Sequence, residues 1–441
     1  MQKTVALHTL GCKLNYSETT ALGRMLENDG FAKKDFDEVA DVYVINTCSV
    51  TENADKECRQ IVRKIQRKAP EALVVITGCY AQLKPKEIAA IPGVDLVLGA
   101  AEKFNIAHHL KEVSKNDATK ICSCDVEDVN VFVPSHSLNE RTRIFLKVQD
   151  GCDYNCSFCT IPMARGKSRS DEINNVIENV KSIASGGAKE IVLTGINLGD
   201  FGKSSPSPTL PEGEGVLNSN PLNKKEVYKK GENFFDLIQK LDALNNIERY
   251  RISSIEPNLL SNEIIEFVAN SKHFMPHFHI PLQSGSNNTL GAMRRRYKKE
   301  LYAEKVALIK TFMPHCCIGV DVIVGFPGET NEDFAETVEF LRGLDISYLH
   351  VFTYSERDNT HALTIKPVVP VHIRNQRNKI LRSLSYEKMM AFTNKHIGQN
   401  RKVLFESVNK NGMMEGYTDN YIKISSPFKA EWQNEIVDWL V

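Results

Sequence analysis

Short β-rich segments alternate with helical patterns along most of this chain. In its central part six such segments stand out, at 143–150, 190–196, 250–256, 278–283, 318–325 and 349–354. Helical patterns separate them, at 172–185, 234–244, 261–270, 299–311 and 331–344. Parallel strands need crossover connections of this kind, so the alternation predicts a parallel sheet. Six βα units over about 250 residues favour a partial or complete barrel, although an open doubly wound sheet would show the same pattern.

The first 135 residues show the same alternation on a smaller scale. Strands are predicted at 4–9, 42–46, 73–77 and 94–98, with helices at 17–28, 54–68 and 85–90. This order indicates an N-terminal α/β domain, over 1–135, that has a parallel sheet of its own.

The rest of the chain divides into three further parts. We expect a central domain over 136–370, a basic helical linker over 371–401 and a small all-β module over 402–441. The module is predicted from four short strands, at 403–407, 413–417, 421–425 and 435–440. Residues 203–231 are rich in Ser, Pro, Gly and Lys. This composition cannot bury enough apolar surface to fold, and it predicts a disordered insertion.

Charge and hydropathy limit the class of partner. Lys plus Arg and Asp plus Glu both number 55, so local basic patches must hold any nucleic acid. Residues 366–402 carry nine Lys or Arg against one acid, and Arg294, Arg295 and Arg296 form a second patch, so phosphate contacts are expected at both. No apolar run reaches the roughly 18 residues that cross a bilayer, and no secretory signal is recognisable. We therefore expect a cytoplasmic protein without membrane contact.

Three of the eleven cysteines lie within eight residues, directly after the first strand of the central repeat. Cys152, Cys156 and Cys159 are separated by three and then two residues. Loops at the carboxyl ends of parallel strands gather ligands, and clustered thiolates are the usual ligands of iron–sulfur clusters. Zinc is the alternative, but its structural sites usually pair two such units or add histidines. The spacing predicts a 4Fe–4S cluster with three protein ligands and one open iron.

Three other cysteines each follow a predicted strand of the N-terminal sheet. They are Cys12, Cys48 and Cys79. The carboxyl ends of parallel strands meet at one edge, so the three thiols are expected to converge there. Gly11 and Gly78 permit tight turns beside them. The pattern predicts a second iron–sulfur cluster, and the alternative is a set of ordinary core cysteines.

Three further cysteines are expected to be structural, whereas Cys122 and Cys124 lie in a linker-like stretch where a third metal site is the alternative but has no further ligand nearby. Cys58 lies in a helical pattern without a partner cysteine, and Cys316 and Cys317 lead into an apolar strand. His277 and His279 flank a predicted strand, and the alternation of a strand is expected to turn one of them outward.

The three-then-two cysteine spacing after the first strand of a six-fold βα repeat resembles the radical S-adenosylmethionine superfamily. The resemblance implies that the open iron binds the methionyl amine and carboxylate, and that one electron cleaves the cofactor to a 5′-deoxyadenosyl radical. It also implies that Phe158 flanks the adenine and that later strand ends bind the rest of the cofactor. The matching positions are Gly195, Asn197, Ser254, Glu256 and Gln283.

The sequences around the N-terminal cysteines narrow this resemblance. Gly-Cys-Lys-Leu-Asn at 11–15, Asn-Thr-Cys-Ser-Val-Thr at 46–51 and Gly-Cys-Tyr at 78–80 look like the N-terminal domain of the methylthiotransferases. The resemblance covers nearly the whole chain apart from the insertion. It implies an α/β protein with an N-terminal parallel-sheet domain that holds a second 4Fe–4S cluster, a central radical (β/α)6 partial barrel, and a TRAM-like all-β module that binds substrate.

The branches of that family differ in substrate. One modifies isopentenylated adenosine in tRNA, one modifies threonylcarbamoylated adenosine, and one modifies an aspartate of a ribosomal protein. Lys13 within the first motif, the motif at 46–51, Ala-Arg-Gly-Lys-Ser-Arg-Ser at 164–170 and Gly-Ile-Asn-Leu-Gly-Asp-Phe-Gly at 195–202 resemble the threonylcarbamoyladenosine branch, the MtaB type. The isopentenyl branch typically carries Gln-Met where this chain has Lys13 and Leu14.

The resemblance implies a transferase that places a methylthio group on C2 of an anticodon-loop adenine in tRNA. Two equivalents of S-adenosylmethionine would be used, and the electron would come from a donor such as flavodoxin or ferredoxin. An unpaired base suits this chemistry, because it can be splayed into a pocket. A non-catalytic iron–sulfur RNA-binding protein is the alternative from another class.

Overall fold

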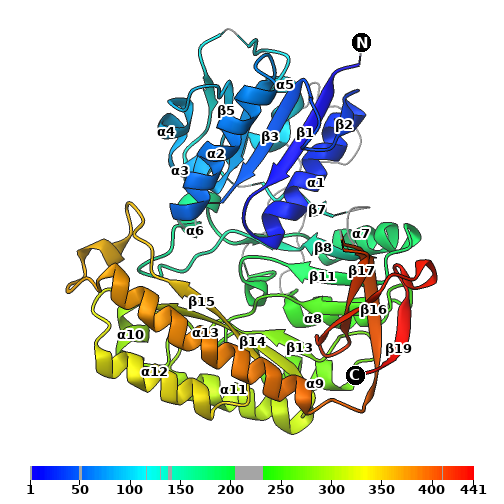
Figure 1. Ribbon diagram of the computed structural model, residues 1–441, viewed down its shortest axis with the longest axis vertical. Helices are drawn as coiled ribbons and strands as arrows, with labels where there is room; N and C mark the ends of the chain where they lie inside the picture. Colours follow the sequence, from blue (N-terminus) through cyan, green and yellow to red (C-terminus); the bar gives the residue numbers. More distant parts are fainter. Residues whose placement is uncertain are drawn as a thin grey trace.

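The structure is a computed structural model that describes residues 2–48, 52–115, 117–129, 131–137, 142–203, 232–409 and 411–441. The predicted insertion at 203–231, apart from its first residue, lies outside these described residues, as does the end of the 46–51 motif. In Figure 1 the N-terminal sheet lies at the top, the central strands lie below it, and the C-terminal module lies at the lower right. Within the described ranges no helix has the length and hydropathy needed to cross a membrane.

The N-terminal sheet is parallel throughout, with the strand order β2-β1-β3-β4-β5-β6. Its strands are β1 (Thr4–Thr9), β2 (Ala32–Lys34), β3 (Val42–Thr47), β4 (Leu73–Gly78), β5 (Leu96–Leu98) and β6 (Lys120–Cys122). Its helices are α1 (Lys13–Asn28), α2 (Glu52–Lys68), α3 (Cys79–Leu83), α4 (Pro85–Ala89) and α5 (Ile106–His109). The four predicted strands are confirmed. The two edge strands were not predicted, because three half-exposed residues give no clear apolar pattern.

Two apolar layers cover the two faces of this sheet. Alternate residues of β3 point to opposite faces, so Tyr43 and Ile45 pack in one layer while Val42 and Val44 pack in the other. The first layer is completed by α2 and α4, and the second by α1 and α5. Burial on both faces explains the continuous apolar runs in the sequence.

The central strands follow one another in space in the same order as in the chain. They are β8 (Arg143–Lys147), β11 (Glu190–Thr194), β12 (Arg249–Ile252), β13 (His277–His279), β14 (Cys317–Val324) and β15 (Tyr348–Thr353). All neighbours pair in parallel, and isolated bridges at Ser254–His279 and Tyr250–Phe274 join β12 to β13. A doubly wound sheet would reverse its strand order, so the order identifies a (β/α)6 barrel. No pairing joins β8 to β15 among the described residues, so the barrel is partial.

Helices flank these strands at the predicted places. They are α7 (Ile173–Ser185), α8 (Phe234–Asp242), α9 (Asn262–Asn270), α11 (Lys299–Phe312) and α12 (Asn331–Gly343). Shorter elements complete this part, namely α6 (Ile161–Arg165), α10 (Asn287–Ala292), the antiparallel pair β9 (Gln149–Asp150) and β10 (Arg169–Ser170), and β7 (Ser135–His136). β7 pairs antiparallel with β8 and spans the predicted domain boundary at 135.

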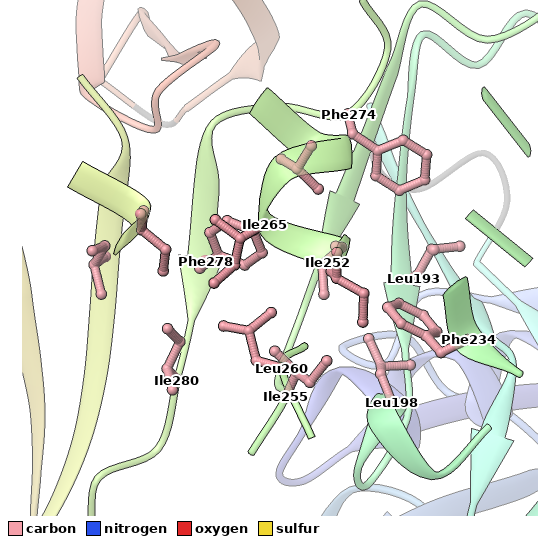
Figure 2. Close-up of a cluster of buried hydrophobic side chains, with 14 of the residues drawn as sticks. Leu193, Leu198, Phe234, Ile252, Ile255, Leu260, Ile265, Phe274, Phe278 and Ile280 are labelled. Carbon is pink, nitrogen blue, oxygen red and sulfur yellow. The ribbon is translucent and has the colours of Figure 1, made fainter. Parts of the chain in front are cut away.

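The main core lies between the barrel strands and their helices. Figure 2 shows Leu193, Ile252 and Phe278 from the strands facing Phe234 and Ile265 from the helices. Because side chains alternate along a strand, the residues between these apolar ones face the barrel interior, which we call the lumen. The lumen is therefore lined largely by residues outside the main core.

The chain ends in a long helix and a small sheet. α13 (Val371–Asn394) packs along β15 (Figure 1). The sheet has the order β18-β17-β16-β19 and is antiparallel throughout. Its strands are β16 (Asn400–Val408), β17 (Met413–Thr418), β18 (Lys423–Pro427) and β19 (Ile436–Leu440), which confirms the predicted all-β module.

Replacing Phe278 by alanine should destabilise the barrel strongly, because the ring is fully buried in the main core. We expect the free energy of unfolding to fall by about 3–5 kcal/mol, the usual cost of such a cavity. Urea denaturation measures this change. The matched variant Phe312→Ala removes a ring that is 44% exposed and should change the free energy by less than about 1 kcal/mol. Equal effects of the two variants would contradict the assigned core.

Candidate active site

The loop with the predicted cysteine triplet starts where β9 ends. Gly151 has a φ of +69°, and a Cβ there would overlap the carbonyl oxygen of Lys167. Only glycine fits this turn without displacing the backbone. The Cys152 N–H donates to the carbonyl oxygen of Gly166 at 3.1 Å, which fixes the start of the loop. The tight turn after the strand therefore determines where the first thiol lies.

Each thiol of the triplet accepts a hydrogen bond from a nitrogen. Such donors stabilise a negatively charged sulfur and are the surroundings that metal-bound thiolates need. The pairs are Tyr154 N–H to Cys152 Sγ at 3.4 Å, Arg295 Nη1 to Cys156 Sγ at 3.2 Å, and Ile161 N–H to Cys159 Sγ at 3.5 Å. The donor set and its surroundings fit an iron–sulfur cluster.

Burial keeps these thiols protonated when no metal is bound. It raises the pKa of Cys152 and of Cys159 to about 12, and the neighbouring Cys156 contributes to both shifts. Burial also raises the pKa of Cys156, which Arg295 opposes. A metal must therefore displace three protons, so its binding is expected to weaken as pH falls.

The predicted cofactor residues lie at the carboxyl ends of three neighbouring strands. Gly195 and Asn197 follow β11, Ser254 and Glu256 follow β12, and Gln283 follows β13. Arg295 joins this set to the triplet, because its Nη2 donates to Glu256 Oε1 at 2.8 Å while its Nη1 contacts Cys156 Sγ. The Glu256 N–H faces Asn197 Oδ1 at 3.5 Å. Gln283 has a φ of +70°, and its N–H donates to the Asp321 carbonyl oxygen at 2.8 Å, so its backbone is held at the strand end.

Phe158 lies in a small apolar cluster beside the triplet. Its ring meets Phe326 edge-on, with 6.2 Å between centroids, and Met293 and Ile323 belong to the same cluster. These side chains form an apolar wall next to the thiols. Such a wall excludes water, which a reactive radical requires.

The N-terminal cysteines converge at one sheet edge. Cys12, Cys48 and Cys79 each come directly after a strand end or its turn, and β1, β3 and β4 are adjacent. A Cβ on Gly11 would lie 2.5 Å from Cys48 Cβ, so the turn before Cys12 packs against Cys48. Burial raises the pKa of the Cys79 thiol, and nearby Cys12 raises it further.

A buried group of charges lies between the two sets of cysteines. Glu18 Oε1 on α1 contacts Lys103 Nζ at 2.7 Å, Arg165 Nη1 at 3.1 Å and Lys147 Nζ at 3.2 Å. Arg165 Nη1 also contacts Asp150 Oδ1 at 2.9 Å, one residue before the turn that leads to Cys152. We call this group, with Arg169 on Asp150, the buried ion network.

The buried ion network carries four cations and two anions, a surplus of two positive charges. Arg165 interacts with the N-terminal set, since Glu18 and also Cys79 and Cys12 raise its pKa against the effect of burial. Its Nη2 also donates to Asn15 Oδ1 at 2.5 Å, three residues after Cys12. A buried positive surplus is costly unless anions lie nearby, so the network suits thiolate-bound, negatively charged clusters.

A third polar group lies inside the barrel, on three adjacent strands. His279 Nε2 lies 2.9 Å from Asp321 Oδ1, and one ligand atom from each of His279, Asp321 and His350 lies within 4.8 Å of the others. Two imidazoles and a carboxylate could hold a single divalent metal ion. The expectation for His277 and His279 is wrong, because residues two apart on a strand share a face and both point into the lumen.

The C-terminal module closes the end of the lumen at which the strands begin. Tyr421 stacks on His277 with centroids 4.1 Å apart, and the guanidinium of Arg251 lies 5.0 Å from the Tyr421 ring. Arg251 also donates to the carbonyl oxygens of Thr418 and Asp419 at 2.8 and 2.9 Å. The turn between β17 and β18 is thus locked onto the barrel, and the cysteine triplet lies at the opposite end.

Several predicted phosphate contacts have partners within the protein. Arg295 donates to the Cys156 sulfur of the triplet, and Arg296, which is exposed, lies over the Tyr154 ring at 3.8 Å. In the basic segment, Arg374 and Arg377 are buried against acidic partners. Sequence alone missed these pairings, because the acids lie on other elements.

Replacing Glu18 by glutamine should weaken the packing of the two sheets, because it leaves buried cations without their shared anion. We expect the free energy of unfolding to fall by about 3–5 kcal/mol, as for other broken buried pairs. Urea denaturation under anaerobic conditions measures it. The pKa of Glu18 is far below its ordinary value because of Arg165, Lys103 and Lys147, although burial opposes them. Its contribution is therefore complete at neutral pH and is lost only in strong acid.

The control for this variant is Glu178→Gln, which breaks the exposed pair between Glu178 and Lys181. Exposed pairs of this kind contribute about 0–1 kcal/mol. Similar losses in both variants would show that the buried ion network has no special weight.

Two family models match the two halves of the chain that carry this site, and curated relatives match both halves at once. The family model described as "Uncharacterized protein family UPF0004" matches residues 4–99, and the model of the radical SAM superfamily matches residues 146–341. A solved structure with a similar fold is the radical S-adenosylmethionine methyltransferase TsrM from Kitasatospora setae. Its TM-score is 0.54 at 16% identity, over 80% of this chain and 72% of that chain.

Curated relatives match almost the full length. The threonylcarbamoyladenosine tRNA methylthiotransferase MtaB of Bacillus subtilis (strain 168) is 38% identical over 96% of this chain and 90% of its own length. The protein of the same name from Aquifex aeolicus (strain VF5) is 38% identical over 95% and 96%. The chain therefore belongs to the radical SAM methylthiotransferase family, and these two relatives are of its MtaB type.

Proposed function

We propose that the protein is a tRNA methylthiotransferase that converts N6-threonylcarbamoyladenosine next to the anticodon into its 2-methylthio derivative. The observation that carries the proposal is the pair of cysteine trios at facing ends of two parallel sheets, with Arg165 between them. Curated relatives at 38% identity carry the name of this activity.

We assign the two trios to two 4Fe–4S clusters. Cys152, Cys156 and Cys159 would hold the one that binds S-adenosylmethionine, and Cys12, Cys48 and Cys79 would hold the other. When bound, these groups supply reductive cleavage of S-adenosylmethionine and the sulfur that is transferred. The remaining cofactor residues are proposed from their strand-end positions, and they are Phe158, Gly195, Asn197, Ser254, Glu256 and Gln283.

The protein's own side chains contribute orientation and exclusion of water. Arg295 holds the Glu256 carboxylate and the Cys156 sulfur in fixed positions, so neither can rotate away from the site. Phe158 and Phe326 shield the same region from solvent. Tyr421 closes the far end of the lumen, which leaves the end beside the triplet for the substrate base.

The tRNA would approach along the open side of the barrel. A cavity of about 420 Å³ lies there between β15 and α13, lined by His350, Phe352 and Arg382 among others. Arg382 and Lys379 are exposed on α13 and are the phosphate contacts that we propose. We also propose a cytoplasmic location, where tRNA and a donor such as flavodoxin or ferredoxin are available.

We propose that the four sequence divisions have distinct tasks. Residues 1–135 would provide the auxiliary cluster, 136–370 the radical chemistry, 371–401 the connection and 402–441 the TRAM-like substrate module. Isopentenyladenosine in tRNA, a ribosomal-protein aspartate and a non-catalytic iron–sulfur role are the alternatives. Nucleoside mass spectrometry of tRNA from a deletion strain separates them, because loss of 2-methylthio-threonylcarbamoyladenosine is expected only from the proposed function.

Mutation of the two cysteine trios should abolish different activities. Cys152→Ala should abolish formation of 5′-deoxyadenosine, whereas Cys48→Ala should retain it and lose methylthio transfer. Each variant should bind about four irons per chain instead of about eight, because each trio holds one cube. Iron analysis and anaerobic turnover with S-adenosylmethionine and dithionite measure these outcomes.

Cys124→Ala is the matched control, since Cys124 lies outside both trios and is only partly buried. It should keep about eight irons and both activities. Equal loss of cofactor cleavage in Cys152→Ala and Cys48→Ala would contradict the proposed division between the trios.

A further inference from the structure

Lys13 extends from the N-terminal domain into the barrel. It is the first residue of α1, directly after Cys12, and its Nζ lies 5.9 Å from the centroid of the Phe145 ring. Ile144 and Leu146 pack in the main core between the strands and their helices. Phe145, which lies between them on β8, therefore faces the lumen. The ammonium of one domain therefore lies inside the other, next to a cysteine of the auxiliary trio.

This ammonium has no anionic partner within the described ranges. No carboxylate oxygen in them lies within 4.0 Å of Lys13 Nζ. Asp321 is the acid that faces it, and His279 already holds Asp321 Oδ1 at 2.9 Å. The other charged groups on this side, Arg143 and Arg251, are cations with acidic partners of their own.

The ammonium of Lys13 lies beside an aromatic ring and not beside an acid. The residue is exposed, and its Nζ lies next to Phe145, which faces the lumen. An ammonium beside apolar atoms lacks full hydration on that side and gains from an anion.

Local stability does not explain a lysine at this position. The first turn of α1 contains no acidic residue, so the charge of Lys13 faces the positive end of the helix dipole unopposed. Sequence choices that break a local rule without compensation are expected at functional positions.

We propose that Lys13 binds the carboxylate of an amino acid that the substrate adenine carries on N6. Asp321 and His350 line the same lumen and would face the hydroxyl and urea groups of that amino acid. This inference rests on the proposed function and deepens it, because it names the residue that selects the substrate. A hydrocarbon group on N6 would leave Lys13 desolvated and unpaired, and a site of this kind rejects such a substrate.

The test uses the reconstituted enzyme and two synthetic anticodon stem-loops. One carries N6-threonylcarbamoyladenosine, and the other carries its methyl ester, in which the carboxylate is neutral. The variants are Lys13→Met and Lys13→Arg, with Lys181→Gln as control, since Lys181 is half-exposed on α7 and pairs with the exposed Glu178. The measurements are kcat/KM for methylthio transfer, iron content and 5′-deoxyadenosine formation.

We expect the unmodified protein to lose about 30-fold or more in kcat/KM on the ester, the usual effect of removing one partner of a buried charge pair. Lys13→Met should lose a similar factor on the acid, mainly through KM, and should no longer distinguish the two RNAs. Lys13→Arg should restore most of the preference for the acid. Iron content should stay unchanged in all variants.

Two outcomes overturn the inference while leaving the proposed function intact. One is a protein of natural sequence that turns over acid and ester equally. This outcome is informative even if the variants do not fold. The other is a Lys13→Met enzyme that prefers the acid as strongly as before, or that loses iron and both substrates alike. Failure of the unmodified protein to methylthiolate either RNA would instead reject the proposed function.

Discussion

The salt bridges of Glu18 determine how the two halves of the molecule meet. This carboxylate lies on a helix of the N-terminal domain, yet two of its three cationic partners, Lys147 and Arg165, belong to the barrel. Breaking a buried pair leaves charges that neither water nor protein can solvate, so the two domains are bound to one relative position. Because Arg165 and Asp150 flank the cysteine triplet in the chain, that position also sets the separation of the two cysteine trios.

The positive surplus of the same network gives it a second consequence. A protein that only needed to join two domains could do so with matched charges or apolar contacts, which often give equal or greater stability. The excess of cations is costly unless negative groups arrive, so the folded chain favours anionic clusters electrostatically. Stability and cofactor retention are thus expected to be linked.

Local patterns in the sequence predicted most of the fold and the places where the candidate cluster cysteines lie. The buried strands appear as continuous apolar runs, and the helices show a clear apolar period, so their positions agree within a few residues. The convergence of the cysteines could be predicted because they follow strands, and the carboxyl ends of parallel strands meet at one edge of a sheet. Contacts across the domain interface were not predicted, because Glu18 and Arg165 are 147 residues apart and nothing local joins them. The same reason hid the partners of Arg295 and the insertion of Lys13 into the barrel.

The turn that carries Tyr421 affects how substrate enters the enzyme and how product leaves it. It covers the end of the lumen at which the strands begin, while β8 and β15 stay unpaired among the described residues and leave one side of the barrel open. A nucleotide in the lumen therefore enters and leaves beside the cysteine trios or through that open side. Because arrival and departure share these openings, release of one RNA is expected before the next one binds.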